Sequence, residues 1–185
     1  MQEDHHRTWG FVVYRTTYDS DADWAEFPRR LRVDMEYDFD FCNGRDILDK
    51  FTPTILEDRS LFEGASTDTF RRHFQRWSLT AYPTEQQQPQ ESSESESGRS
   101  FVDIGYSPRY RYALEVDAEA LHSLVHVSLA PPDFDKKKLS WVKLIDRSWY
   151  LGRGESTSDP LEPIEGMIVE DVGSAKVSYQ SVMTT

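Results

Sequence analysis

Arg15 is the residue whose type and position point most directly to chemistry. It lies within WGFVVYRTTY (residues 9–18), a β-branched and aromatic segment that predicts a buried strand. A buried arginine must be paired or must line a cavity, because an unpaired buried charge is very costly. Together with Tyr14, Tyr18 and Asp146, which ends a later strand, Arg15 predicts a pocket for a carboxylate or phosphate. The alternative is that strand alternation turns Arg15 toward solvent, with Asp146 as a structural partner.

Arginine clusters form the second kind of candidate site. Arg71, Arg72 and Arg76 fall largely away from the apolar stripe of a predicted helix, and residues 29–32 hold three more arginines. These side chains predict either an anion-binding face or pairing with the surplus of acidic residues. If both clusters shared one face, an acidic ligand or RNA would become a credible partner.

Metal and nucleophile signals are weak. His122 and His126 are four residues apart on a predicted helix, but two ligands are too few and the glutamate of an HExxH motif is absent. Cys42, the single cysteine, is expected to be a small buried hydrophobe. We expect no metal centre and no cofactor, and we assign no catalytic residue.

An acidic run lies between residues 34 and 40, where Asp34, Glu36, Asp38 and Asp40 alternate with mostly aromatic and apolar residues. The carboxylates would share one face only if the segment were a strand, and periodicity does not decide between strand and helix. The run predicts a site for a hard cation or a basic peptide, or a solvated face.

The elements that must position these residues alternate between strand and helix. Further strands are predicted at residues 51–57 (an edge strand), 110–116, 139–149 and 166–169, and helices follow the caps at 19–21, 66–68 and 117. Pro28 is expected to kink or break the first helix near Phe27, and Pro83 to end the second. The order βαβα, linker, βαββ predicts an α+β fold with a mixed or antiparallel sheet and helices packed on one face.

One stretch interrupts this pattern. Residues 84–100 are rich in Gln, Ser and Glu and are almost free of apolar side chains, which predicts a disordered insertion. The predicted organisation is a flexible N-terminus (1–8), a single domain (9–175) containing that insertion, and a tail (176–185). The 185 residues are enough for one core.

Charge and composition narrow the partners. Thirty-three acidic and 21 basic residues give a net charge of -12, which disfavours general binding to nucleic acid without excluding it. The N-terminus has no signal-like apolar region, no apolar run reaches the ~20 residues of a membrane helix, and a lone cysteine excludes an internal disulfide. We therefore expect a cytoplasmic or nuclear protein that does not bind membranes.

Four blocks of the sequence together resemble a known family: WGFVVYRTTY (9–18), GASTDTFRRHFQRW (64–77), RYALEVD (111–117) and WVKLIDRSW (141–149). They are similar to a family of small, uncharacterised fungal (ascomycete) proteins. The resemblance implies a fungal, non-secreted protein that often belongs to sets of paralogues. It transfers no catalytic residue.

Two functions are compatible with these observations. The first is a non-enzymatic interaction or regulatory domain that binds a protein partner or a small anionic ligand. The second is a small enzyme of fungal specialised metabolism with a pocket lined by Arg15, such as an isomerase, a cyclase or an aminoacyl-tRNA-dependent ligase. The acidic surface and the absence of any nucleophile-base signature favour the first.

Overall fold

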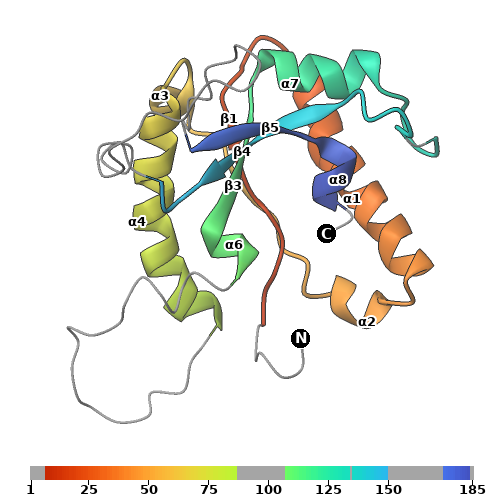
Figure 1. Ribbon diagram of the computed structural model, residues 1–185, viewed down its shortest axis with the longest axis horizontal. Helices are drawn as coiled ribbons and strands as arrows, with labels where there is room; N and C mark the ends of the chain where they lie inside the picture. The colour runs from red at the N-terminus through yellow and green to blue at the C-terminus, as the bar shows by residue number, and fades with distance from the viewer. Residues whose placement is uncertain (1–6, 87–106, 134, 150–172, 184–185) are drawn as a thin grey trace, which may run out of the picture.

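A five-stranded mixed sheet forms the centre of the computed structural model, which describes residues 7–86, 107–133, 135–149 and 173–183 (Figure 1). The strand order is β2-β1-β3-β4-β5, with β2, β1 and β3 parallel and β4 and β5 antiparallel. The strands are β1 (Val12–Arg15), β2 (Thr54–Leu56), β3 (Tyr112–Val116), β4 (Trp141–Asp146) and β5 (Ser174–Ser178). The α+β prediction is confirmed, as is the edge position of the second strand.

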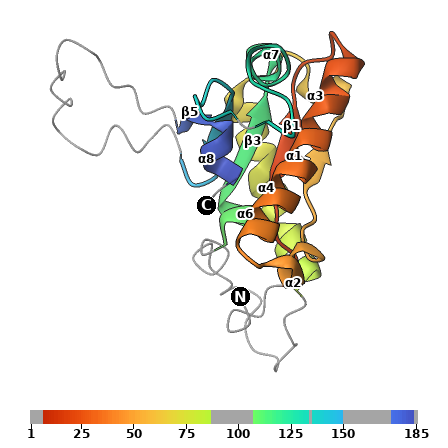
Figure 2. The same ribbon diagram turned by 90° about the vertical axis from the view of Figure 1, so that its right-hand side faces the viewer.

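Helices pack on both faces of the sheet, so the expectation of a single covered face is wrong (Figure 2). Helices α1 (Asp21–Phe41), α7 (Ala118–His122) and α8 (Tyr179–Met183) cover one face, and α3 (Arg59–Phe62) and α4 (Thr67–Gln86) cover the other. The reason is topological. The connection from β1 to β2 runs in one direction and the connection from β2 to β3 runs back past β1, and right-handed crossovers in opposite directions place their helices on opposite faces.

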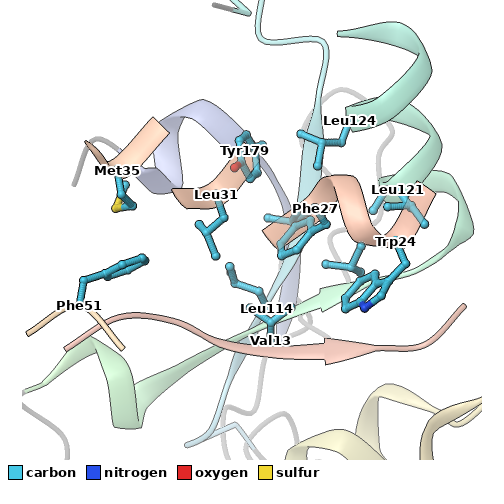
Figure 3. Packing of buried hydrophobic residues seen from close by; sticks show 13 residues of the cluster. Val13, Trp24, Phe27, Leu31, Met35, Phe51, Leu114, Leu121, Leu124 and Tyr179 are labelled. Atoms are coloured by element: carbon cyan, nitrogen blue, oxygen red, sulfur yellow. The ribbon is translucent and has the colours of Figure 1, made fainter. Parts of the chain in front are cut away.

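Two apolar clusters hold these layers together. In the larger one, Phe27 and Leu31 of α1 pack above Val13 and Leu114 of the sheet (Figure 3). In the smaller one, Tyr14 of β1 lies among aromatic side chains of α3 and α4. Each fully buried side chain of this size stabilises the fold by about 1.5–3 kcal/mol.

Helix α1 runs without a break through Pro28, contrary to the expected interruption. It begins at the N-cap Ser20, whose side chain accepts a hydrogen bond from the backbone N–H of Asp23. Leu31 and Met35, buried after Pro28, hold the helix against the sheet, and this packing offsets the one backbone bond that proline removes. The undecided segment 35–41 is therefore helical, and Asn43 and Gly44 follow it as a turn.

Helix α4 also continues through a proline. It extends to Gln86, so Pro83 does not end it and residues 84–86 belong to a helix rather than to the predicted insertion. The remainder of the predicted insertion, 87–100, lies outside the described residues.

The C-terminal part contains the elements that the sequence pattern did not predict. A short helix α6 (Pro108–Arg111) precedes β3, and α7 ends in a π-helical turn, η1 (Ser123–Val127). Residues 174–183, assigned mostly to a tail, form β5 and α8, whereas the strand expected at 166–169 lies outside the described residues.

The N-terminal part contains one further short helix, α2 (Arg45–Leu48), which follows α1.

Candidate functional site

Arg15 lies at the carboxyl end of β1, beside the carboxyl end of β2. The strand order β2-β1-β3 reverses at β1, and the carboxyl ends of the strands at such a reversal are where open α/β sheets usually bind ligands. Arg15 is 6% exposed. The prediction of a buried arginine at this position is therefore correct, and its turning to solvent is excluded.

The guanidinium of Arg15 is already occupied by protein groups. Its Nε donates to the carbonyl of Thr17 at 2.9 Å, and its terminal nitrogens form ion pairs with Asp21 and, at 3.5 Å, with Glu57. The ring of Tyr18 stacks against it, with the guanidinium carbon 4.5 Å from the ring centroid. These contacts stabilise the crevice and commit each of the three guanidinium nitrogens to an acceptor of the protein itself.

Asp146 is not the partner of Arg15. In the register of β3, Val116 lies beside Arg15 while Tyr112 lies opposite Asp146, so the two charged residues are at opposite ends of the sheet. The Asp146 carboxylate accepts the backbone N–H of Ser148 at 2.7 Å.

Tyr14 points to the face opposite Arg15 and belongs to a different environment. Its hydroxyl is joined to Nδ1 of His73, on α4, by a hydrogen bond of 2.9 Å. Burial raises the pKa of Tyr14 well above its ordinary range, and burial followed by the charge of Arg76 lowers the pKa of His73. The structure does not bring Tyr14 together with Arg15 and Tyr18 into one site.

The two arginine clusters do not form a common basic face, because α1 and α4 lie on opposite sides of the sheet. Arg71 is buried, against expectation, and donates to the carbonyls of Asp146 at 3.1 Å and Gly173 at 3.2 Å. Arg72 is exposed on the outer side of α4. Arg30 on α1 is buried and binds the carbonyl oxygens of Leu124 and its neighbours in η1.

The weaker metal and nucleophile candidates carry no site. His122 and His126 are exposed, and Nε2 of His126 lies 3.0 Å from the carboxylate of Asp23. No group of three or more metal-ligating side chains occurs among the described residues. Cys42 is exposed rather than buried, and the acidic run 34–40 is helical, so its carboxylates do not line up on one face.

A charged cluster around Glu115 was missed by the sequence analysis. Glu115 of β3 is 5% exposed, and Lys143 of β4 joins it to Asp117, at 3.1 Å and 2.6 Å. The second carboxylate oxygen of Glu115 has no hydrogen-bond partner among the described residues. Burial raises the pKa of Glu115, although Lys143 works in the opposite direction. The signal was a glutamate inside the apolar strand YALEV.

The second missed cluster lies at the opposite end of the parallel strands. The Arg109 guanidinium of α6 donates two hydrogen bonds of 2.8 Å to the carboxylate of Glu85, at the end of α4. It also donates to the carbonyls of Gly10 and Thr52. Tyr110 donates to Glu85 at 2.8 Å, and the amide of Gln86 donates to the Tyr110 hydroxyl at 2.6 Å.

A surface hollow of about 510 Å³ lies between α7, η1, the start of β4 and the middle of β5. Its lining residues come from three segments of the chain: Ala118, Glu119, His122, Ser123, Val127, Leu139, Trp141 and Lys176. Val127 and Leu139 are large apolar residues that remain 48% and 46% exposed. The Lys176 ammonium lies 3.8 Å from the centroid of the Trp141 ring and 3.2 Å from Glu119. We call this feature the Trp141 hollow.

A second hollow, beneath Arg30, Asp34 and Tyr179, has room for about 10 Å³, the space of a single water molecule. Neither hollow is lined by Arg15, Tyr14 or Tyr18.

Searches of protein-family models, curated proteins and solved structures produce no match to this chain. The similarity to fungal proteins therefore remains a prediction. A bilayer-spanning helix needs about 20 successive apolar residues, and no helix in the described ranges meets the length and apolarity required.

Proposed function

We propose that this protein is a non-enzymatic interaction domain, and that it holds a segment of a partner protein in the Trp141 hollow. The observation that carries the proposal is the exposure of Val127 and Leu139, which line a concave surface together with Trp141. Burying exposed apolar area in a concave site is the main source of binding free energy in protein recognition. The proposal retains the expected cytoplasmic or nuclear location.

The alternative of a small enzyme needs an open pocket at Arg15. The guanidinium there is occupied by two carboxylates, a backbone carbonyl and an aromatic ring, and both described hollows lie elsewhere. Glu115 and Lys143 form an acid-base pair, but neither residue lines either hollow. These observations favour binding over catalysis.

Site-specific photo-crosslinking in cells of the source organism tests the proposal. A Leu139→p-benzoylphenylalanine variant should yield one discrete crosslinked product of higher mass. Leu61→p-benzoylphenylalanine is the matched control, because Leu61 is 51% exposed and lies on α3, away from the hollow. Equal crosslinking at both positions, or no product at position 139, would count against an interaction site in the hollow.

A further inference from the structure

We infer that the segment held in the Trp141 hollow is acidic and amphipathic: a short peptide stretch of the partner protein with one or more bulky apolar side chains flanked by Asp or Glu. This inference rests on the proposed function and goes beyond it by naming the chemistry of the partner. It is carried by the distribution of lysine, by the character of the Lys176–Glu119 pair and by the apolar floor.

Lysine is concentrated near this hollow. Five of the six lysines of the chain are Lys136, Lys137, Lys138, Lys143 and Lys176. The first three immediately precede Leu139, which lines the hollow, and Lys176 lines it directly. We call Lys176 and the three lysines before Leu139 the lysine rim. In a chain with a net charge of -12, these positive charges attract a negatively charged segment.

Two of the rim lysines are available for a ligand. The side chains of Lys136 and Lys137 are exposed and make no hydrogen bond or ion pair with any residue in the described ranges, whereas the Lys138 side chain donates to the Ser181 hydroxyl at 3.2 Å. Lys143 is committed to Glu115 and Asp117. The buried arginines are likewise committed, and exposed Arg72 and Arg76 of α4 line neither hollow.

Lys176 is held by a pair that a ligand can replace. The side chains of Lys176 and Glu119 are 58% and 76% exposed, and an exposed ion pair of this kind contributes little stability. A carboxylate of the partner can therefore take the place of Glu119 beside Lys176 at low cost. The lysine stem would remain against the Trp141 ring, where it extends the apolar surface offered to the ligand.

The apolar side chains that line the hollow favour a peptide over a nucleic acid. Val127, Leu139 and Trp141 offer an apolar contact suited to a Leu, Ile, Phe or Met side chain. Strand addition to β5 is disfavoured because Lys176 stands in the middle of that edge strand, a common means of preventing edge pairing. Recognition is thus assigned to side chains: an apolar anchor in the hollow and carboxylates on its lysine rim.

Selection from a phage-displayed library of random dodecapeptides, with the full chain as bait, tests this inference. The enriched peptides are expected to place a bulky apolar residue within two positions of Asp or Glu. Binding of a labelled enriched peptide, measured by fluorescence anisotropy, should weaken at least tenfold in Leu139→Asp and in the Lys136→Glu/Lys137→Glu double variant. Leu61→Asp and Arg72→Glu, matched in type and placed elsewhere, should change the affinity less than twofold.

The outcomes separate this inference from the proposed function. Peptides that depend on Leu139 but lack acidic residues would overturn the inference and leave the interaction domain standing. No enrichment, or enriched peptides indifferent to Leu139→Asp, would overturn both. Binding of a dT12 oligonucleotide that is lost in the double lysine variant would assign the rim to nucleic acid and overturn the inference. In the unmodified chain, the indole N–H signal of Trp141 should shift on peptide addition, and an unchanged signal would also contradict the inference.

Discussion

Positive charge has opposite surroundings in the Arg109 cluster and beside the Trp141 hollow. At the amino end of the parallel strands, Arg109 is 4% exposed and every direction of its guanidinium meets an acceptor: Glu85, two backbone carbonyls and the hydroxyl of Thr54. Lys136 and Lys137 are exposed and closely precede Leu139, which lines the hollow.

The difference separates stability from recognition. A buried charge that loses its partner leaves an uncompensated charge in the interior, so the Arg109 cluster must stay intact for the fold to persist. An exposed lysine is solvated with or without a partner, so the free energy of folding changes little when it gains or loses one. Its charge therefore remains available for an incoming carboxylate. Substitutions in the Arg109 cluster should therefore affect unfolding, and substitutions beside the Trp141 hollow should affect binding.

A pair of deletions gives the largest expected effect. Removing residues 84–100 takes away Glu85 and Gln86, and should lower the free energy of unfolding by more than any single substitution below, because Arg109 and Tyr110 lose their partners together. Removing residues 88–100 spares both side chains and should leave the urea midpoint close to that of the full chain. Equal midpoints for the two deletions would contradict a structural role for the end of α4.

Glu85→Ala should reduce the free energy of unfolding by about 3–5 kcal/mol, because it leaves Arg109 buried and unpaired. Urea denaturation followed by circular dichroism measures the change. Glu63→Ala is the matched control: it breaks the exposed pair with Arg59 and should cost no more than about 1 kcal/mol. If Glu85→Ala lowers the free energy of unfolding as little as Glu63→Ala does, the Arg109 cluster has no special role in stability.

The partly buried Glu85 and the buried Glu115 should respond to pH with opposite signs. Burial acts to raise the pKa of Glu85, but hydrogen bonds from Arg109 and Tyr110 lower its pKa below the ordinary value. Its contribution to stability is therefore present above the unfolded pKa of about 4.5 and lost as the pH falls through the folded value. The pKa of Glu115 is raised, so its contribution is present at low pH and lost as the pH rises through the folded value.

Neutral amides test this opposition. Glu85→Gln should flatten the rise of stability with pH on the acidic side. The stability of Glu115→Gln, relative to that of the unmodified chain, should increase as the pH rises past the raised pKa of Glu115. Thermal melts between pH 3 and pH 7 measure both trends. Parallel pH profiles for the two variants would show that the assigned signs are wrong.

Leu139→Asp should give the smallest change in stability, within about 0.5 kcal/mol, since the side chain it alters is already half exposed. The same variant should lose binding of the enriched peptide. A large loss of stability would mean that Leu139 belongs to the core, which would weaken the assignment of the Trp141 hollow to binding.

Local patterns predicted much of the fold, since β1, β3, β4 and the starts of α1, α4 and α7 follow from β-branched runs and capping residues. The features that the sequence did not predict depend on contacts between residues that are far apart in the chain. Glu85 looks like part of a polar insertion until α6, 24 residues later, brings Arg109 against it. The partner of Arg15 depended on the strand register, which places Asp146 at the other end of β3. The Trp141 hollow joins segments near residues 120, 140 and 176, so no single window of sequence contains it.

The position of β1 also sets an order of events during synthesis. The backbone N–H of Thr16, at the end of β1, bonds to the carbonyl of Val116, 100 residues later in the chain. On the ribosome, β1 is synthesised about 100 residues before its β3 neighbour. Until then, an apolar strand has at most β2 beside it, so nascent chains that end before Val116 should be the species that chaperones bind and proteases remove.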